Sequence, residues 1–427
     1  AEIVEEKIST NKLDIIFKVS ESEKLYVEQI NIFGNNITEE NVIRNQLEVD
    51  EGDPFNELLH AKSLNKIRSL NIFKTANTEL INGSTSSTKI ININVEEKPT
   101  GEISLGAGVG SEGGTLGFGI KENNFLGKGI GLSTTLKLTA DSVRGNFTVN
   151  NPNFNYSGRA LSTNIESSKT DKLADSGYET TKLGISVGTS FEEYENLYFN
   201  PQIAISSEKI NTDSTASAAL KKQDGSFFQT KISYSLDYDL RDKRYKTTDG
   251  TRSIFTQGIP LISDDYAFLN TYQFTKWYQL DNKMITDLGF YVSAIQSLTD
   301  EDVKISNRLT IPRNRLRGFK AGQVGPVDNA DFVGGNYAAT VNFNTTLPML
   351  LPSLEDVEFK YFFDVANLWG VDYAKTNDQS NTVRSSTGIT MDWFTPVGPL
   401  SFSLAHNLNK ADTDVIEKFQ FNLGTTF

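Results

Sequence analysis

The sequence predicts an all-β transmembrane barrel of about 16 antiparallel strands, preceded by a small α+β domain with the order βααββ. Two observations favour the barrel. After residue 99, short stretches alternate apolar and polar residues between turns, and the helical spacing of apolar residues disappears. The chain also combines only 37% hydrophobic residues with 32 Gly, 27 Phe and 15 Tyr. This suits a barrel, because alternate residues of each strand face lipid and aromatic residues collect at both membrane interfaces.

Composition excludes several other classes of protein. The mean hydropathy is -0.36, and no stretch approaches the roughly 18 apolar residues that a membrane helix needs. A sheet inside lipid must close, because its backbone polar groups find no water there. The chain has no Cys and two His, so we expect no disulfide, no metal and no cofactor. A net charge of -13 argues against nucleic-acid binding, which usually shows a concentrated basic patch.

The α+β domain is expected over residues 23–98. Residues 25–33 alternate as a strand, and residues 34–36 form a turn. Thr38 is expected as the N-cap of a helix that continues to Leu47. Pro54 introduces a second helix, whose apolar residues recur at helical spacing through about Ile72. Two strands, 74–81 and 88–97, close the domain across a turn that contains Gly83.

Residues 1–22 do not fit inside this domain. Residues 13–19 resemble residues 90–96, and each stretch precedes acidic residues. We therefore expect residues 1–22 to contain the closing strand of a preceding copy of the same domain. The chain starts at Ala1 without an export signal, so we expect a processed or truncated form that hides the number of preceding copies.

Residues 99–427 are expected to form the barrel. At roughly 20 residues for a strand with its loop, this length gives about sixteen strands, an even number as bacterial barrels require. Short turns such as 396–399 alternate with longer polar stretches at 168–177, 211–225 and 374–386. The expected strands lie within residues 102–108, 115–121, 130–138, 160–167, 183–187, 229–238, 253–257, 272–277, 286–295, 338–343, 357–363, 387–393, 400–406 and 419–427.

The final strand carries the pattern of a transmembrane strand. One of its faces collects Phe419, Phe421, Leu423 and Phe427, while the other collects polar residues and Gly424. Such a strand can present one face to lipid and the other to a wet interior. The final strand of a soluble sandwich is the alternative that these residues alone leave open.

The tripeptide Arg317-Gly318-Phe319 lies in the long segment between strands 286–295 and 338–343. It resembles the Arg-Gly-Phe/Tyr motif that marks the outer-membrane assembly factor superfamily, and further motifs resemble the BamA family within it. The α+β domain resembles the POTRA domain next to the barrel. Further resemblances to the BamA barrel lie in residues 117–127, 239–242, 247–252, 362–364, 393–400 and 419–424. Together they cover nearly the whole chain.

The resemblance assigns roles to particular residues. In the family, the loop Arg folds back into the lumen and pairs with an Asp of a late strand, which here implies Arg317 and Asp364, beside Phe362. A guanidinium in a partly desolvated lumen needs a carboxylate partner. The alternative is an exposed turn at Arg317 and a merely lumen-facing Asp364. This chain has Ala366 where the family usually has Gly, which leaves the local backbone geometry open.

The function implied by the family is insertion and folding of other barrels at a seam between the first and last strands. The expected seam residues are Glu102, Ile103, Ser104, Leu105 and Gly106 in the first strand and Phe419, Phe421, Leu423, Gly424 and Phe427 in the last. A glycine-rich first strand packs weakly, so the seam can open, and its free edge can template an incoming strand. Alternatively, these glycines simply let the sheet bend.

The resemblance also implies a location and partners. We expect an outer-membrane barrel in contact with lipid and a POTRA domain in the periplasm. Its substrates would be unfolded outer-membrane proteins, and its partners accessory lipoproteins of the BamD kind and periplasmic chaperones. A TamA-like translocation factor or a two-partner secretion transporter of the same superfamily is the alternative. The α+β domain and Arg317-Gly318-Phe319 argue against a passive porin, which requires neither.

Enzymatic interpretations are weak, and we expect no catalytic residue. Residues 108–113 fit G-x-G-x-x-G, but strand-like sequence follows where a phosphate site needs a helix N-terminus. His406 shares strand parity with Phe402, whereas Ser401 and Ser403 point the other way. The acidic runs at 264–265 and 300–302 are usual in solvated loops.

Overall fold

The computed structural model describes most of the chain, which divides into two units. Unit 1 comprises residues 1–100 and 123–130, and unit 2 comprises residues 101–122 and 131–427. The described residues are 2–9, 12–18, 24–244, 246–281, 284–348, 350, 356–372, 382–395 and 398–424. The expected turn at 396–399 and the expected loop at 374–386 lie partly outside them, as does Phe427.

The first two strands form a sheet of their own. β1 (Glu2–Ser9) pairs antiparallel with β2 (Lys12–Lys18). The strand expected at residues 13–19 corresponds to β2, apart from Val19, which lies outside the described residues.

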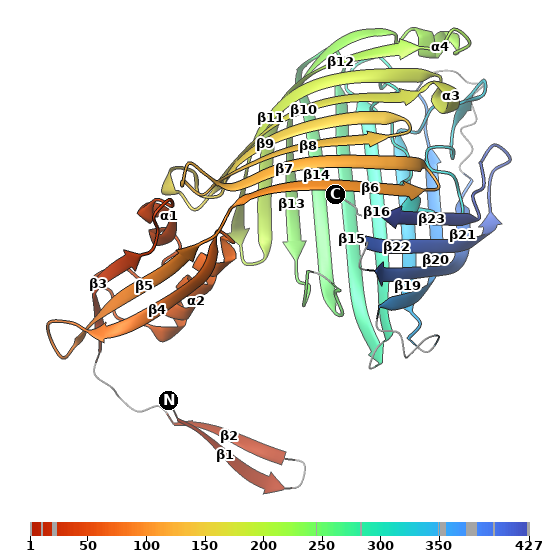
Figure 1. Cartoon of the computed structure of the whole chain (residues 1–427). Coiled ribbons are helices and arrows are strands. Elements are labelled where there is room, and N and C mark those ends of the chain that lie inside the picture. The colour runs from red at the N-terminus through yellow and green to blue at the C-terminus, as the bar shows by residue number, and fades with distance from the viewer. Residues whose placement is uncertain are drawn as a thin grey trace. The chain divides into compact units, whose positions relative to one another are not determined.

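The α+β domain has the predicted βααββ order. It consists of β3 (Tyr26–Phe33), α1 (Glu40–Arg44), α2 (Glu57–Ser69), β4 (Phe73–Asn82) and β5 (Thr88–Glu97). The sheet order is β3-β5-β4, with β3 parallel to β5 and β4 antiparallel to it (Figure 1). Apolar residues of both helices and all three strands form one buried core, which includes Ile30, Ile43, Ile67, Ala76 and Ile93.

The predicted start of the first helix is wrong. α1 begins at Glu40, and its N-cap position is Glu39, which makes no side-chain cap. Thr38 is buried, and its hydroxyl accepts a hydrogen bond from Asn124 Nδ2 at 2.9 Å. The Thr38 hydroxyl therefore accepts from a side chain distant in sequence, whereas an N-cap hydroxyl would accept from a backbone N–H of the first helical turn. In α2, Asn56 is the N-cap and accepts from the backbone of the first turn.

Residues 123–130 are part of unit 1 because they pack on the entry to α1. The backbone N–H of Glu39 donates to the carbonyl of Gly127 at 2.8 Å. Gly127 has φ +72°, and a Cβ at this position would collide with the carbonyl oxygen of Ile37. Only Gly fits both the backbone conformation and the space.

Unit 2 is a closed antiparallel barrel of sixteen strands in the described residues, as predicted. Consecutive strands pair with each other, and β23 closes the barrel by pairing with β6 (Figure 1). The strands are β6 (Gly101–Gly110), β7 (Gly113–Phe125), β8 (Ile130–Thr139), β9 (Ser142–Asn151), β10 (Ala160–Lys172), β11 (Tyr178–Tyr194), β12 (Leu197–Thr212), β13 (Gly225–Asp239), β14 (Gly250–Ser263), β15 (Ala267–Asp281), β16 (Met284–Ser297), β19 (Tyr337–Thr346), β20 (Val357–Trp369), β21 (Arg384–Thr395), β22 (Gly398–Asn409) and β23 (Phe419–Gly424).

Short elements occupy the connections between some barrel strands. They are η1 (Phe154–Tyr156), α3 (Leu173–Ser176), α4 (Ala218–Lys221), η2 (Arg313–Arg315), β17 (Val327–Asp328) and β18 (Asp331–Phe332). None of the described helices is long and apolar enough to cross a membrane.

Two barrel strands, β9 and β12, were not among the strands expected from sequence. Pro201 lies inside β12, where a missing N–H normally argues against a central strand. No pair joins Pro201 to β11, because the pairs of this ladder pass from Gly188↔Gln202 to Phe191↔Phe199 without a change of register. On its other side, Pro201 lies opposite Tyr234 of β13. The ladder thus lacks pairs on one side at the proline. The expected loop at 168–177 is also shorter, because β10 continues to Lys172.

Apolar side chains project outward from the barrel with a period of two. On β11, Leu183, Ile185 and Val187 are 59%, 45% and 38% exposed, while Ser186 between them is buried. On β20, Tyr361 and Phe363 are exposed, while Phe362 and Asp364 are completely buried inside. Exposed apolar side chains outside and polar ones inside are the arrangement that a lipid-spanning barrel requires.

Candidate functional site in the lumen and at the seam

The segment between β16 and β19, residues 298–336, folds into the barrel and is called the inner loop below. Its residues Leu316 and Phe319 are 2% and 1% exposed. They pack against inward-facing residues of β19 and β20, namely Ala338, Ala366 and Leu368. Burial of these apolar side chains fixes the part of the loop that carries Arg317.

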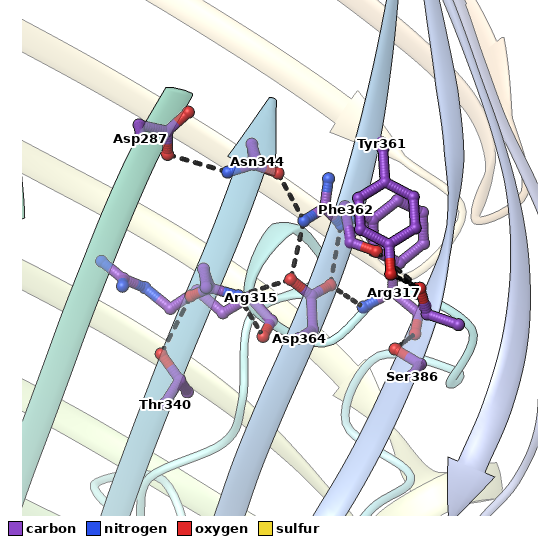
Figure 2. A network of polar contacts seen from close by, with 11 residues as sticks. Asp287, Arg315, Arg317, Thr340, Asn344, Tyr361, Phe362, Asp364 and Ser386 are labelled. Carbon is purple, nitrogen blue, oxygen red and sulfur yellow. Dashed lines mark hydrogen bonds and ion pairs between the residues drawn. The ribbon is translucent and has the colours of Figure 1, made fainter. Parts of the chain in front are cut away.

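Arg317 of the inner loop pairs with Asp364 of β20. Its Nε donates to Asp364 Oδ2 and its Nη2 to Oδ1, both at 2.7 Å, and its backbone N–H donates to Oδ2 at 3.0 Å (Figure 2). Asp364 is completely buried, and Asn342 Nδ2 also donates to it at 2.7 Å. The guanidinium lies 3.8 Å from the ring centroid of Phe362, as a cation–π contact. The structure thus brings together the three residues that the resemblance implied.

Two asparagines of β19 extend this network, and sequence reasoning missed them. Asn344 Oδ1 accepts from Arg317 Nη2 at 2.7 Å, and Asn344 Nδ2 donates to Asp287 of β16 at 2.8 Å (Figure 2). Asn342 Nδ2 also donates to the carbonyl of Arg315. The sequence pattern could have predicted their inward direction, because Asn342 and Asn344 alternate with the outward-facing Val341 and Phe343. Ala366, the departure from the family pattern, lies in regular pairing with both neighbouring strands.

Gly318 and Phe319 join the inner loop to the end of the barrel. Gly318 has φ +87°, and a Cβ there would lie 2.7 Å from the Cβ of Ala405. Asn407 Nδ2 donates to the carbonyl of Gly318 at 2.8 Å, and Gln420 Nε2 donates to that of Phe319 at 3.0 Å. The motif therefore contacts β22 and the last strand itself.

The seam between β23 and β6 is short. In the described part of the chain, it consists of the pairs Asn422↔Gly110, Leu423↔Val109 and Gly424↔Gly108. Next to it, the backbone N–H of Ser111 donates to the carbonyl of Phe421 at 3.1 Å. By contrast, β10 and β11 pair without interruption from Ala160↔Ser190 to Lys172↔Tyr178.

The structure distributes the expected seam residues unevenly. Glu102, Ile103, Ser104, Leu105 and Gly106 pair with β7, and no described residue of β23 lies opposite them. Leu423 and Gly424 pair with β6 at its other end, at residues 108–110. Phe419 and Phe421 pair with β22, and Phe427 lies outside the described residues.

A cavity of about 630 Å³ lies between the Arg317 network and the seam. It is lined by residues from both, including Asp287, Arg317, Lys360, Asp392, Gly108, Gln420 and Asn422. Side chains of both charge signs line it, so its wall is polar. Among the described residues, no group of three or more His, Asp or Glu side chains is arranged to hold a metal ion.

Comparison with known proteins places the chain in a family. Residues 124–427 match the model of the Omp85 superfamily domain, and residues 25–98 match the POTRA model, described as a surface antigen variable number repeat. An outer membrane protein assembly factor BamA from Neorickettsia risticii is 26% identical over 98% of this chain and 57% of its own length. The one from Neisseria meningitidis is 24% identical over 98% of this chain and 58% of its own length. The chain therefore spans little more than half of these relatives.

Solved structures share the fold. The crystal structure of BamA from Haemophilus ducreyi lacking POTRA domains 1–3 matches with a TM-score of 0.85 at 23% identity, covering 100% of this chain and 89% of that one. CdiB from Acinetobacter baumannii matches with a TM-score of 0.59 at 12% identity, covering 94% and 74%. These findings confirm the family expected from the motifs. Because the family model matches well over half of its residues, the chain belongs to the Omp85 superfamily.

Proposed function

We propose that this chain inserts and folds β-barrel proteins into the bacterial outer membrane by templating their strands at the seam between β23 and β6. The observation that supports this proposal is the short pairing of β23 with β6, three residue pairs in the described part of the chain. Residues 101–107 of β6 lack a described partner on that side. A free strand edge presents N–H and C=O groups that an incoming strand can pair with.

The energy needed to open such a seam is small. A backbone hydrogen bond contributes about 0.5–1.5 kcal/mol net, so separating the three pairs costs on the order of a few kcal/mol. Opening an uninterrupted ladder such as β10–β11, which extends over thirteen residues of β10, would cost several times more. In the described part of the chain, the seam therefore opens at lower cost than such a ladder, and no covalent chemistry is needed.

The outer face of β6 is suited to an amphipathic strand. Ile103 and Leu105 are 75% and 81% exposed, and they project on the lipid-facing side with a period of two. An incoming strand that pairs with this edge would place its own apolar face beside them. Backbone pairing and lateral apolar contact would then favour the same register.

The remaining assignments extend this proposal to the whole protein. The relatives named above are outer membrane protein assembly factors, and we assign this chain the same location, with residues 23–98 as a periplasmic POTRA domain and residues 99–427 as the barrel. Residues 1–22 would close a preceding POTRA domain, since β1 and β2 pair antiparallel as β4 and β5 do. Substrates would be unfolded outer-membrane proteins, and BamD-like lipoproteins and periplasmic chaperones would bind the POTRA domains.

Reconstitution into liposomes tests the activity. We expect the chain to accelerate the folding of a urea-unfolded outer-membrane protein over empty liposomes, and Arg317→Ala to lose this acceleration. No acceleration, even after addition of the partner lipoproteins, would contradict the proposal and favour a transport function such as that of a two-partner secretion transporter.

A seam disulfide tests the mechanism. The chain has no cysteine, so Val109→Cys with Leu423→Cys, which lie opposite each other, creates a single possible bridge. Oxidation should abolish the acceleration, and reduction should restore it. The matched control is Ile185→Cys with Ile205→Cys, which bridges the ordinary ladder between β11 and β12 and should not affect activity. Full activity of the oxidised seam variant would exclude opening at this seam.

A further inference from the structure

A second buried Arg–Asp pair lies beside the inner loop. Arg384 begins β21, and Asp414 lies between β22 and β23, in residues 410–418, called the last loop below. Arg384 Nε donates to Asp414 Oδ2 at 2.9 Å, and Nη2 donates to Oδ1 at 3.0 Å. Neither side chain has exposed surface. A bidentate pair without water must satisfy its remaining hydrogen-bonding groups within the protein.

The surroundings of the pair come from several elements. Arg384 Nη1 donates to Asn367 Oδ1 on β20 at 3.2 Å. Asp414 accepts from the backbone N–H of Ala411 at 2.7 Å and from that of Gly325, in the inner loop, at 3.3 Å. One carboxylate therefore ties the last loop to β21 and to the inner loop at the same point.

From Asp414 the chain runs along the inner loop directly into β23. The isolated bridge between Phe319 and Ile416 is antiparallel, and backbone hydrogen bonds flank it. These bonds run from Val415 N to the Gln323 carbonyl at 3.1 Å, from Lys320 N to the Val415 carbonyl at 2.9 Å, and from Glu417 N to the Gly318 carbonyl at 3.0 Å. The start of the last strand is thus held by the inner loop.

The two ends of β23 are held very differently. At its start, the buried pair and the inner-loop bonds fix the chain, and β22 pairs with residues 419–423. At its end, β23 pairs with β22 through Leu423 and, in the described part of the chain, with β6 by three pairs. The buried pair and the inner-loop bonds hold only the start of the strand, so separation of the described seam pairs leaves that start in place.

The apolar pattern of β23 does not by itself fix the register of the seam. Phe419, Phe421 and Leu423 occupy alternate positions, so a slip of two residues would still place apolar side chains on the same face. A one-residue slip would reverse the faces and is excluded by the pattern. Another constraint must therefore select between registers two residues apart, and a fixed starting point for the strand provides it.

We propose that Arg384 and Asp414 are positioning residues that anchor the start of the last strand and thereby select the seam register. This inference rests on the proposed function: a seam that opens to template strands must close again in one register after each opening. The pair itself touches no substrate. Buried ion pairs often contribute little net stability compared with apolar replacements, and fixing a register is their best-attested use.

Register can be measured by disulfide formation in the full chain. Val109→Cys with Leu423→Cys reports the register of the structure, and Val109→Cys with Phe421→Cys reports a two-residue slip. Each pair is introduced into the wild type and into Arg384→Met/Asp414→Asn. This double variant removes both charges and keeps a side-chain acceptor for the N–H of Ala411. We expect the wild type to form the 109–423 bridge almost exclusively, and the double variant to shift the ratio severalfold toward 109–421.

The matched control is another Arg–Asp pair of the inner loop, in which the Arg is buried and the Asp side chain is 26% exposed. Arg308 of the inner loop donates to Asp372 at 2.5 Å, and its side chain is likewise unexposed. The other hydrogen bonds described for this pair reach Val303 and Asn336, which lie in the inner loop away from β23. Arg308→Met/Asp372→Asn should leave the crosslinking ratio unchanged. Heat-modifiable gel mobility verifies that each barrel is folded. Where the Arg384 double variant fails to fold, Arg384→Lys keeps a charge in the site and gives the same comparison.

The outcomes separate this inference from the proposed function. A ratio that is unchanged in folded Arg384 variants would overturn the anchoring role, even if the wild type accelerates folding in liposomes. A shifted ratio would support the anchor even if the wild type accelerates nothing, because crosslinking does not depend on substrate. A shift of equal size in the Arg308 control would mean that loss of either ion pair loosens the barrel in general. It would therefore also overturn the inference.

Discussion

The guanidinium of Arg317 donates two hydrogen bonds of 2.7 Å to the carboxylate of Asp364, and the backbone N–H of Arg317 adds a third. The carboxylate belongs to a barrel strand and the guanidinium to the inner loop, so this pair fastens the loop to the wall. Because the same loop segment carries the backbone bonds to the last loop, the position of β23 depends on a contact made on β20.

Arg317→Ala should release the inner loop without unfolding the barrel. The variant leaves Asp364 buried without its charge partner, and breaking a buried pair in this way costs roughly 3–5 kcal/mol. The barrel ladders do not depend on this pair, so displacement of the loop is the cheaper response. We expect rapid proteolysis within residues 298–336 while the barrel keeps its heat-modifiable mobility. A loop as protected as in the wild type would contradict the fastening role.

Gly318→Ala should have a similar effect for a steric reason. The new Cβ would lie 2.7 Å from the Cβ of Ala405, and φ +87° is unfavourable for any side chain. Gly322→Ala is the matched control, because Gly322 has φ +75° but a Cβ added there would meet no heavy atom within 4 Å. We expect loop proteolysis to rise strongly for Gly318→Ala and slightly for Gly322→Ala. If both variants raised proteolysis equally, backbone strain alone would explain the change, and the contact with Ala405 would have no part in it.

Alternation of apolar and polar residues was sufficient to predict the barrel, and the length of residues 99–427 predicted its number of strands. Alternation failed where local sequence conflicts with the pairing. Pro201 argues against a strand at the position of β12, although the missing pairs toward β11 accommodate it. Thr38 has the sequence pattern of a helix cap, but a side chain 86 residues away takes its hydroxyl. Such tertiary contacts have no local signal, so no periodicity can reveal them.

The functional site was predictable only in part, and for a similar reason. Arg317 and Asp364 came from resemblance to a family, since nothing in their spacing says that they meet. Arg384 and Asp414 were missed, because a single Arg at a strand start and a single Asp in a loop resemble any solvated charges. Their burial arises from the packing of two loops. The exact pairs of the seam likewise depend on where the last loop places β23.

Asn124→Ala should loosen the contact between residues 123–130 and the entry to α1. Asn124 is buried, donates to Thr38 and accepts from the N–H of Gly129, so its truncation leaves buried polar groups unpaired at a cost of about 1–3 kcal/mol. Hydrogen exchange should accelerate in residues 36–44 and 123–130 together. Asn36→Ala is the control, because that side chain is exposed, and it should leave exchange unchanged. Acceleration in one segment alone would argue against a shared contact.

The fold around residues 36–44 should become less stable in acid, because the Glu97 carboxylate that stabilises it is then protonated. Desolvation by burial acts to raise the pKa of Glu97, but hydrogen bonds from the Thr38 side chain and from the backbone N–H groups of Thr38, Ile37 and Asn36 outweigh it and hold the pKa below its usual 4.5. A carboxylate with a depressed pKa stabilises the fold fully above the pKa of the unfolded chain, and this contribution is lost as the pH falls through the folded pKa. Glu97→Gln removes the charge at every pH.

We therefore expect residues 36–44 of Glu97→Gln to exchange faster than wild type at pH 7. The difference should shrink as the pH falls through the lowered pKa of Glu97 and the wild-type carboxylate is protonated. The comparison is made between the two proteins at the same pH, so the intrinsic pH dependence of exchange cancels. Glu79→Gln, on the neighbouring strand β4, serves as the control and should match wild type throughout. A difference that persists undiminished in acid would mean that Glu97 acts through its shape and not through its charge.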